Sequence, residues 1–115
     1  MSEEESETSS SSALKELADF LDDSTLKSSI RLLIVISLAL NRKLGFTDLL
    51  ELTGTGKGSL SNHLDRLASS GYIKLRIVPT LKGPRTIAEI TQKGLETYQK
   101  YLVLIEKIRD RKTGF

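Results

Sequence analysis

The chain has 115 residues, which is long enough for one modest domain and short for two. It contains no cysteine and a single histidine, His63, so a disulfide framework, a thiolate metal site and a zinc site made of histidines are all excluded. The formal net charge is +2, but residues 1–23 carry −7 and residues 24–115 carry +9. A body this basic suggests a polyanionic partner, although the same excess can serve solubility alone.

Residues 1–12, with the sequence MSEEESETSSSS, hold one apolar side chain, that of Met1. Such a segment cannot offset its ordering entropy by burial, which predicts a disordered acidic tail. Structure is expected to begin near Ala13, with Ser12 as the helix cap. The first helix is predicted to be short and amphipathic, because its apolar residues share one helical face: Leu14, Leu17, Ala18 and Leu21.

The segment from residue 24 to residue 45 is apolar on nearly every side, which predicts the buried central helix. Ser24 or Thr25 is its expected cap and Gly45 its expected stop. The longest apolar run, residues 32–40, is too short to cross a bilayer. The chain starts without a basic segment followed by an apolar stretch, so we expect a cytoplasmic protein that does not bind a membrane.

Two further helices are predicted before the chain changes its pattern. The first covers residues 46–53, with Thr47 as its cap and Gly54 after its last turn. The second carries leucines at i, i+4 and i+7 and ends at Gly71. These leucines are Leu60, Leu64 and Leu67, and the positions between them are mostly polar. The second helix is therefore expected to bury one face only.

The sequence GTGKG between these two helices raises the question of a phosphate-binding loop. A P-loop would need glycine in place of Glu51, and Ser or Thr instead of Gly58 after Lys57. A dinucleotide-binding loop would need a strand before the glycines, where this chain has a helix. The cluster instead predicts a sharp turn between two crossed helices, which is a helix-turn-helix.

The polar face of the second helix is the candidate reader of DNA. Its candidate residues are Ser59, Ser61, Asn62 and Arg66. Asn can pair with adenine, Arg can pair with guanine, and Ser can bond to a base or a phosphate. Lys57, just before the helix, suits a phosphate. An ordinary surface helix is the alternative, and His63, beside Leu60 and Leu67, is predicted to be semi-buried and structural.

From residue 73 the apolar period changes to two, which predicts a half-exposed strand over residues 73–77. Residues 79–85 are predicted to form a turn with Gly83 and Pro84 at its tip. Residues 86–90 would then return as the second strand of a hairpin. A two-stranded hairpin is weak by itself, so this one must rest against the helices.

The elements together predict a mainly α fold with a small β-hairpin. At the hairpin tip, Lys82 and Arg85 are candidate contacts to DNA phosphates or to a narrow minor groove. A charged tip that meets only solvent is the alternative. The DNA-binding domain is assigned to residues 13–91 and the last helix to residues 92–115.

The last helix, capped by Thr91, carries two neighbouring apolar stripes. The first holds Leu95, Tyr98, Leu102 and Ile105, and the second holds Tyr101, Leu104 and Ile108. One small domain cannot cover both stripes, which favours a homodimer through this helix, joined by residues 13–22. The candidate interface residues are Leu95, Tyr98, Tyr101, Leu102, Ile105 and Ile108.

Three stretches carry a family resemblance: SSIRLLIVISLAL, FTDLLELTGTGKGSLSNHLDRLASSGYIK and EITQKG. They resemble winged helix-turn-helix transcriptional regulators of the MarR and ArsR type, over the region from Lys27 to Leu104. The pattern from Ser61 to Tyr72 is among its most specific parts. The resemblance implies a dimeric repressor or activator that reads pseudo-palindromic DNA, with a small-molecule effector left open. The cysteine-based metal sensing of many ArsR-type proteins has no counterpart here.

The sequence therefore predicts a non-enzymatic regulator that binds specific double-stranded DNA as a homodimer and needs no cofactor. No nucleophile, general base or metal cage is evident, because the chain has no cysteine, one histidine and acidic clusters only near its N-terminus. The alternative function is a winged-helix module that binds another protein, since the same fold supports both roles.

Overall fold

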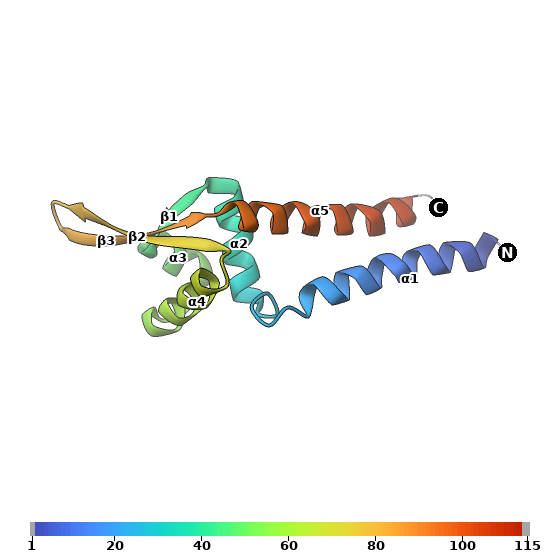
Figure 1. Cartoon of the computed structure of the whole chain (residues 1–115), viewed down its shortest axis with the longest axis horizontal. Coiled ribbons are helices and arrows are strands. Elements are labelled where there is room, and N and C mark those ends of the chain that lie inside the picture. Colours follow the sequence, from blue (N-terminus) through green and yellow to red (C-terminus); the bar gives the residue numbers. More distant parts are fainter. Residues whose placement is uncertain (1, 114–115) are drawn as a thin grey trace.

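The computed structural model describes the backbone of residues 2–113 and the side chains of residues 12–110. Over this part of the chain it contains five helices and one three-stranded antiparallel sheet. The elements are α1 (Ser2–Leu21), α2 (Ser29–Asn41), β1 (Lys43–Gly45), α3 (Phe46–Thr53), α4 (Lys57–Ser69), β2 (Ile73–Thr80), β3 (Gly83–Ile90) and α5 (Gln92–Thr113). The predicted fold class is confirmed. In Figure 1, α1 and α5 form a stem on one side of the body, and the β2–β3 hairpin, here called the wing, protrudes on the other.

The core lies where α2, α3 and α4 meet the sheet. One buried cluster contains Ile34, Val35 and Leu38 of α2, Leu49 of α3, and Leu60, Leu64 and Leu67 of α4. The burial of α2 and the one-sided burial of α4 are therefore confirmed. Because α4 buries only its leucine face, its opposite face remains at the surface.

The first helix is longer than the sequence predicted. It begins at Ser2 rather than near Ala13, so helical backbone extends through the segment that composition predicted to be a disordered tail. Residues 3–7 include four glutamates. Glutamate is a good helix former, and negative charge is favourable at a helix N-terminus, which accounts for helical backbone over these residues.

The cap of α2 is Ser28, not Ser24 or Thr25 as the sequence predicted. The Ser28 hydroxyl oxygen accepts the backbone N–H of Arg31 at 3.3 Å. Ser24 and Thr25 lie in the preceding turn, where the Asp23 carboxylate already accepts the Thr25 N–H at 2.8 Å. The Asp23 carboxylate also accepts the Leu26 N–H, so Asp23 caps this turn and Ser28 caps α2 one turn later.

The end of α2 also differs from the prediction, which placed the stop at Gly45. The helix ends at Asn41, and Arg42 takes a φ of +73°. The chain then enters β1, which pairs antiparallel with β3 from Glu89 to Ile87. The sheet order is β1-β3-β2. A three-residue strand is too short to give a period-two signal, so the sequence did not reveal it.

The wing is longer than predicted and has a different tip. The two strands pair from Ile73 opposite Ile90 to Thr80 opposite Gly83, so only Leu81 and Lys82 form the turn. Gly83 and Pro84 belong to β3 instead of the tip. Pro84 faces Pro79 across the hairpin, which is compatible with a pair that exchanges no backbone hydrogen bonds.

Thr91 caps α5, as the sequence predicted. Its hydroxyl oxygen accepts the N–H of Gly94 at 3.1 Å and lies 2.6 Å from the carbonyl oxygen of Gly71. Gly94 packs so closely on the Tyr72 carbonyl and the Ile90 side chain that a Cβ at this position would overlap both. The start of α5 is therefore fixed against the junction between α4 and β2.

The stem consists of α1 and α5, which run antiparallel (Figure 1). The rings of Phe20 and Tyr101 have centroids 6.0 Å apart, and the Lys107 ammonium lies 3.2 Å from the Glu16 carboxylate. Leu104 is 3% exposed. Two members of the second apolar stripe of α5, Tyr101 and Leu104, therefore pack within their own chain, although Tyr101 was predicted to contact a partner.

Candidate nucleic-acid interface

The turn between α3 and α4 sets the direction of α4. Gly45, rather than the predicted Thr47, is the N-cap of α3, and the Asp48 carboxylate accepts the Gly45 N–H at 3.3 Å. At the other end, Gly54 takes a φ of +66° and donates its N–H to the Leu50 carbonyl at 3.0 Å. Glycine suits this left-handed conformation, which ends the helix sharply. The predicted helix-turn-helix is thus present.

The N-terminus of α4 is uncovered. Gly56 is the N-cap and offers no side-chain hydrogen bond to the first turn. A Cβ at Gly56 or at Gly58 would meet nothing within 4 Å, and Lys57 between them is exposed. The first N–H groups of a helix lack partners within the helix and carry partial positive charge. This end of α4 therefore suits an anion such as a phosphate.

A shallow groove runs along the exposed surface of α4 and reaches Arg31 of α2. Its lining residues are Arg31, Ser59, Asn62, His63, Asp65, Arg66 and Ser69. Of the predicted DNA-binding residues, Ser59, Asn62 and Arg66 come together here, and all three are exposed. Lys57 and Ser61 are exposed on the same helix but do not line the groove.

The sequence analysis missed three residues of this groove. Asp65 and Ser69 follow Asn62 by three and seven residues, so helical periodicity could have placed them on the same face. Arg31 comes from α2, and only the packing of α2 against α4 brings it to the groove. An exposed carboxylate on this face adds an acceptor for a cytosine amino group to the donors already predicted.

His63 is half-buried and bonded to Arg31. Its Nδ1 lies 3.1 Å from the Arg31 guanidinium. Burial lowers the pKa of His63, and the positive charge of Arg31 lowers it further. Since a guanidinium can only donate, Nδ1 must accept, and the proton of the neutral ring sits on Nε2. This contact supports the structural interpretation of His63 over base reading.

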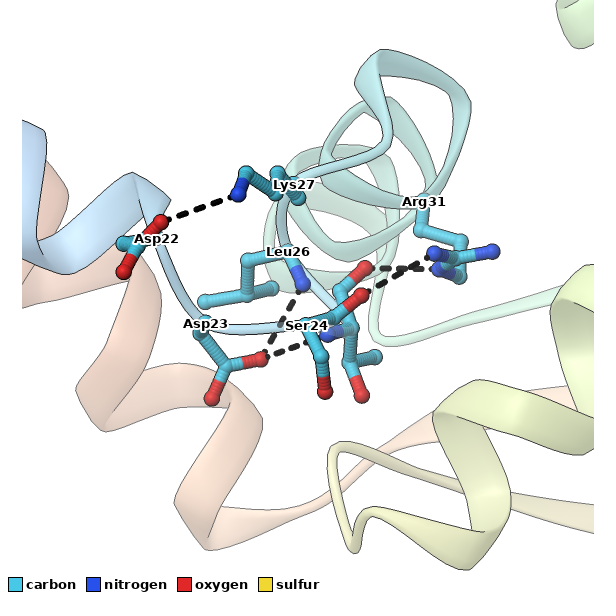
Figure 2. A network of polar contacts seen from close by, with 7 residues as sticks. Asp22, Asp23, Ser24, Leu26, Lys27 and Arg31 are labelled. Carbon is cyan, nitrogen blue, oxygen red and sulfur yellow. Dashed lines mark hydrogen bonds and ion pairs between the residues drawn. The ribbon is translucent and has the colours of Figure 1, made fainter.

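The turn between α1 and α2, residues 22–28, holds Arg31 in place (Figure 2). The Arg31 guanidinium donates to the Thr25 carbonyl at 2.6 Å and to the Ser24 carbonyl at 3.2 Å. The Arg66 guanidinium donates to the Ser24 hydroxyl at 3.1 Å. The Arg66 bond connects the α1–α2 turn directly to α4, and the Arg31 bonds connect the same turn to α2.

Asp23 organises the turn from its other side. One carboxylate oxygen accepts the N–H groups of Thr25 and Leu26, as Figure 2 shows, at 2.8 and 3.1 Å. The other oxygen accepts the Tyr72 hydroxyl at 3.2 Å. Burial acts to raise the pKa of Asp23, but these hydrogen bonds and the charge of Lys93 outweigh it, so the pKa is lowered. The carboxylate is therefore held in its charged form.

Tyr72 links the turn to α5. The Lys93 ammonium lies 4.6 Å from the centre of the Tyr72 ring and donates to the Ser70 carbonyl at 2.6 Å. Burial raises the pKa of the Tyr72 hydroxyl, and the negative charge of Asp23 raises it further. The neutral phenol can then donate to Asp23. The α1–α2 turn, the end of α4 and the start of α5 are thus joined by one set of polar contacts.

The wing carries the predicted cations at its exposed end. Lys82 lies in the two-residue turn and Arg85 on β3, and both are exposed. Neither side chain is in an ion pair within residues 12–110, whereas Arg76 pairs with Glu89 nearer the body. Figure 1 shows the wing and α4 at the end of the molecule away from the termini. The structure gives no direct contact between the wing cations and the groove.

The predicted dimer residues are unequally exposed. Leu102 is 42% exposed, while Leu95, Tyr98, Tyr101, Ile105 and Ile108 are half-buried. Two exposed apolar side chains of the stem were not predicted: Val103 at 54% and Leu14 of α1 at 52%. Val103 belongs to neither stripe, and Leu14 was grouped only with Leu17, Ala18 and Leu21 on one helical face. Periodicity on one helix cannot show which face a second helix covers.

The family of the chain follows from its sequence as well as its geometry. The model of the winged helix DNA-binding domain family matches residues 30–108. This range contains α3, α4, the wing and most of α5. The chain belongs to this family. The resemblance to winged-helix regulators drawn from the sequence is confirmed, and with it the placement of this winged-helix protein among DNA-binding transcription regulators.

Solved structures agree with the winged-helix assignment. The transcriptional regulator homologue from Pyrococcus horikoshii OT3 is 29% identical, with a TM-score of 0.73 over 84% of this chain and 95% of that one. NadR, solved in complex with 4-hydroxyphenylacetate, is 21% identical, with a TM-score of 0.64 over 90% of this chain and 70% of that one. YusO from Bacillus subtilis is 17% identical, with a TM-score of 0.65 over 89% of this chain and 77% of that one. Among curated proteins, none matches the chain.

The described part of this winged-helix protein has neither a metal-binding cluster nor a membrane-spanning helix. Within it, no group of three or more His, Asp or Glu side chains is arranged to hold a metal ion. No helix there is both long and apolar enough to cross a membrane.

Proposed function

We propose that this winged-helix protein is a homodimeric regulator of transcription that binds specific sequences of double-stranded DNA. The observation that carries the proposal is the outer side of α4, which is exposed, polar and open at its N-terminus. It belongs to a body with a net charge of +9 over residues 24–115. A helix of this kind fits the major groove, with its N-terminal part nearest the bases.

The roles of the α4 residues follow from their positions. Lys57 and the free N–H groups of the first turn would bind a phosphate and so fix how deeply α4 enters the major groove. Asn62 and Arg66 would face base edges, with Ser59 and Ser61 at the two sides of the helix. The Arg66 guanidinium donates one N–H to the Ser24 hydroxyl and keeps its other N–H groups available, because a guanidinium has five. Its plane is therefore oriented before DNA arrives.

The wing would contact DNA beside the site of α4. Lys82 and Arg85 stand at the end of a hairpin that protrudes from the body, with side chains free of ion pairs within residues 12–110. Cations in this position can lie on the backbone or enter a narrow minor groove. Both contacts would add affinity, and the second would favour A·T-rich flanks.

A homodimer would form through the stem. The exposed apolar side chains Leu14, Leu102 and Val103 lie on α1 and α5, away from the wing. Two copies joined here would present two α4 helices on one side of the duplex, with half-sites about 34–36 Å apart. Joining the two half-sites raises the affinity for an operator well beyond that of one copy.

Salt titration of DNA binding tests the central claim. Affinity for duplex DNA should fall steeply with salt, with a slope of about −0.9 on logarithmic axes for each phosphate contact. A module that binds only other proteins would show no affinity for duplex DNA, or a flat salt response. Either of these results would reject direct DNA readout and favour the protein-interaction alternative.

Sedimentation of a stem variant tests the dimer. Replacing Leu102 and Val103 together by Glu would place charges in a desolvated seam, where unpaired ions are strongly disfavoured. Both side chains are exposed within one chain, so the monomer should stay folded. We expect the parent to sediment as a dimer and the variant as a monomer. Leu40→Glu on α2, also at an exposed leucine, is the control that should remain dimeric.

A further inference from the structure

The wing ends in an apolar side chain that nothing in the described chain covers. Leu81 in the turn has a relative exposure of 108%, and Ile77 on β2 has 73%. These are the two highest values among the exposed large hydrophobic side chains of the described residues. Leu81 does not contribute to the core, and its full hydration is unfavourable. A contact outside the chain would remove its apolar surface from water.

The turn that carries Leu81 is well ordered by its own bonds. The Thr80 hydroxyl donates to the Gly83 carbonyl at 2.5 Å and accepts the Lys82 N–H at 3.3 Å. Just behind the turn, Pro79 faces Pro84 across the hairpin. Proline fixes its own φ, so both strands are stiffened next to the tip. Leu81 is thus presented in a restricted position, which reduces the entropy lost on binding.

The charges around Leu81 point to one kind of partner. Residues 74–88 contain four Lys or Arg and no Asp or Glu. Lys82 is the neighbour of Leu81, and Arg85 lies just beyond it on β3. A single leucine surrounded by cations complements a surface that is anionic outside and apolar within. Duplex DNA is such a partner, because stacked bases lie directly behind its phosphates.

We propose that Leu81 is a wedge that inserts between stacked base pairs from the minor groove and bends the bound DNA. This inference rests on the proposed function and adds to it a site of base-step deformation. Leucine is among the side chains that unstack a base step in this way, kinking the duplex toward the major groove. Lys82 and Arg85 would bind the phosphates that flank the opened step.

The wedge has a consequence for sequence preference at positions that α4 does not touch. Pyrimidine–purine steps such as TA are the easiest to unstack. The DNA under the wing should therefore prefer such a step, although Leu81 makes no hydrogen bond to a base. This preference would be indirect, and separable from the direct readout by Asn62.

Bending of a labelled duplex by the parent protein tests the proposal. The probe is the duplex that the parent protein recovers from a random-sequence pool, labelled at both ends for energy transfer and carrying 2-aminopurine at the step under the wing. At saturation the parent should bend this duplex by an angle within the range of about 20–90° seen for wedges, and 2-aminopurine fluorescence should rise. Leu81→Ala should lose most of the bend and of the fluorescence rise.

Two matched variants separate the wedge from charge and from general loss of apolar surface. Lys82→Ala should keep the bend while its logarithmic salt slope becomes smaller by about one. Leu40→Ala, at an exposed leucine on α2, should behave as the parent in every measurement. None of the three side chains is part of the buried core, so the variants should fold alike.

The outcomes distinguish this proposal from the function on which it rests. If the parent binds duplex DNA with a steep salt dependence but Leu81→Ala bends it as much as the parent does, the wedge is rejected and DNA readout stands. A parent that binds its duplex without bending it rejects the wedge in the same way. If the parent has no affinity for duplex DNA, both proposals fail, and the apolar tip must serve another class of partner.

Discussion

The two sides of α4 differ in how firmly the chain holds their side chains. On the side of the α1–α2 turn, His63, Arg66 and Ser70 are bonded to Arg31, Ser24 and Thr25, respectively. On the outer side, Ser59, Ser61 and Asn62 make no side-chain hydrogen bond to any described residue, and nothing buries them. One set of residues therefore fixes α4 in the fold, and another set is left exposed on the surface of α4. Changes at His63 and Ser70 should alter stability, changes at Ser59, Ser61 and Asn62 should alter recognition, and a change at Arg66 should alter both, because Arg66 bonds to Ser24 and is also a proposed base contact.

Gly94→Ala is the most severe test of the contacts that fix α4 in the fold, because Gly94 of α5 packs on the junction between α4 and β2. The added Cβ would overlap the Tyr72 carbonyl and the Ile90 side chain, and the backbone carbonyl cannot move without shifting the junction of α4 and β2. We expect unfolding to become easier by about 1–3 kcal/mol or more, the range for overpacked interiors. Urea titration followed by circular dichroism would measure it.

Gly58→Ala is the matched control on the outer side of α4. Its Cβ would meet nothing within 4 Å, and alanine is the better helix former by about 0.5–1 kcal/mol. This variant should be as stable as the parent or more so, yet bind DNA less well, because the methyl group stands where a phosphate would approach the first turn. If both glycine variants lost equal stability, the contrast between the two sides would be wrong.

Asp23→Ala should produce the next largest loss. It removes three hydrogen bonds to a carboxylate, two from backbone N–H groups and one from Tyr72. Hydrogen bonds to a charged group contribute about 1.5–3 kcal/mol when one partner is lost. The control is Asp22→Ala, which breaks only an exposed ion pair with Lys27 and should cost about 0–1 kcal/mol. Equal denaturant midpoints for the two variants would contradict the role given to Asp23.

The parts of the fold that depend on local signals were predictable from the sequence. The leucines at 60, 64 and 67 share a face in any α-helix, and Gly54 and Thr91 end or begin helices through bonds to nearby residues. The contacts within the α1–α2 turn were not predictable in this way. Ser28 and Thr25 are both acceptable caps by residue type, and the sequence alone does not show that Asp23 caps the preceding turn while Ser28 caps α2.

The residues of the candidate site also fall into two groups, those that local sequence signals predict and those that only tertiary packing brings to the site. Helical spacing alone predicted an exposed polar face with Ser59 and Asn62, and the structure places both at the surface. The groove beside α4 also needs Arg31, which is distant in sequence and reaches His63 only because α2 packs on α4. The coverage of α5 by α1 was missed for a similar reason, since a stripe on one helix does not show which neighbour buries it.

Asn62→Ala should leave stability almost unchanged and alter recognition. Its side chain is exposed and bonds to no described residue, so unfolding should change by less than about 0.5 kcal/mol. Discrimination at one base pair of each half-site should fall by about 1–3 kcal/mol. Competition binding with single-base variants of the selected duplex would measure this. Lys57→Ala should weaken all sequences alike, and an equal effect of Asn62→Ala on specific and random DNA would show that Asn62 reads no base.

The smallest expected effect is the pH dependence that His63 gives to the turn side. Burial first, and Arg31 second, lower the pKa of His63 below its ordinary value of 6.5 in the folded chain. The unfolded chain then binds the proton more readily, so the stability from this site is complete above the ordinary pKa value and is lost as the pH falls through the folded pKa.

The variant His63→Gln keeps an acceptor for Arg31 but cannot be protonated. Asp65 and Arg66 line the same groove. Both are present in the parent and in the variant, so their effects on the pH dependence cancel when the two are compared. Between pH values of about 7.5 and 5, the free energy of unfolding should decrease more for the parent than for His63→Gln. Asn62→Ala, on the outer side, should retain the full dependence of the parent. Parallel curves for the parent and His63→Gln would mean that burial and Arg31 together do not keep His63 neutral in the folded chain.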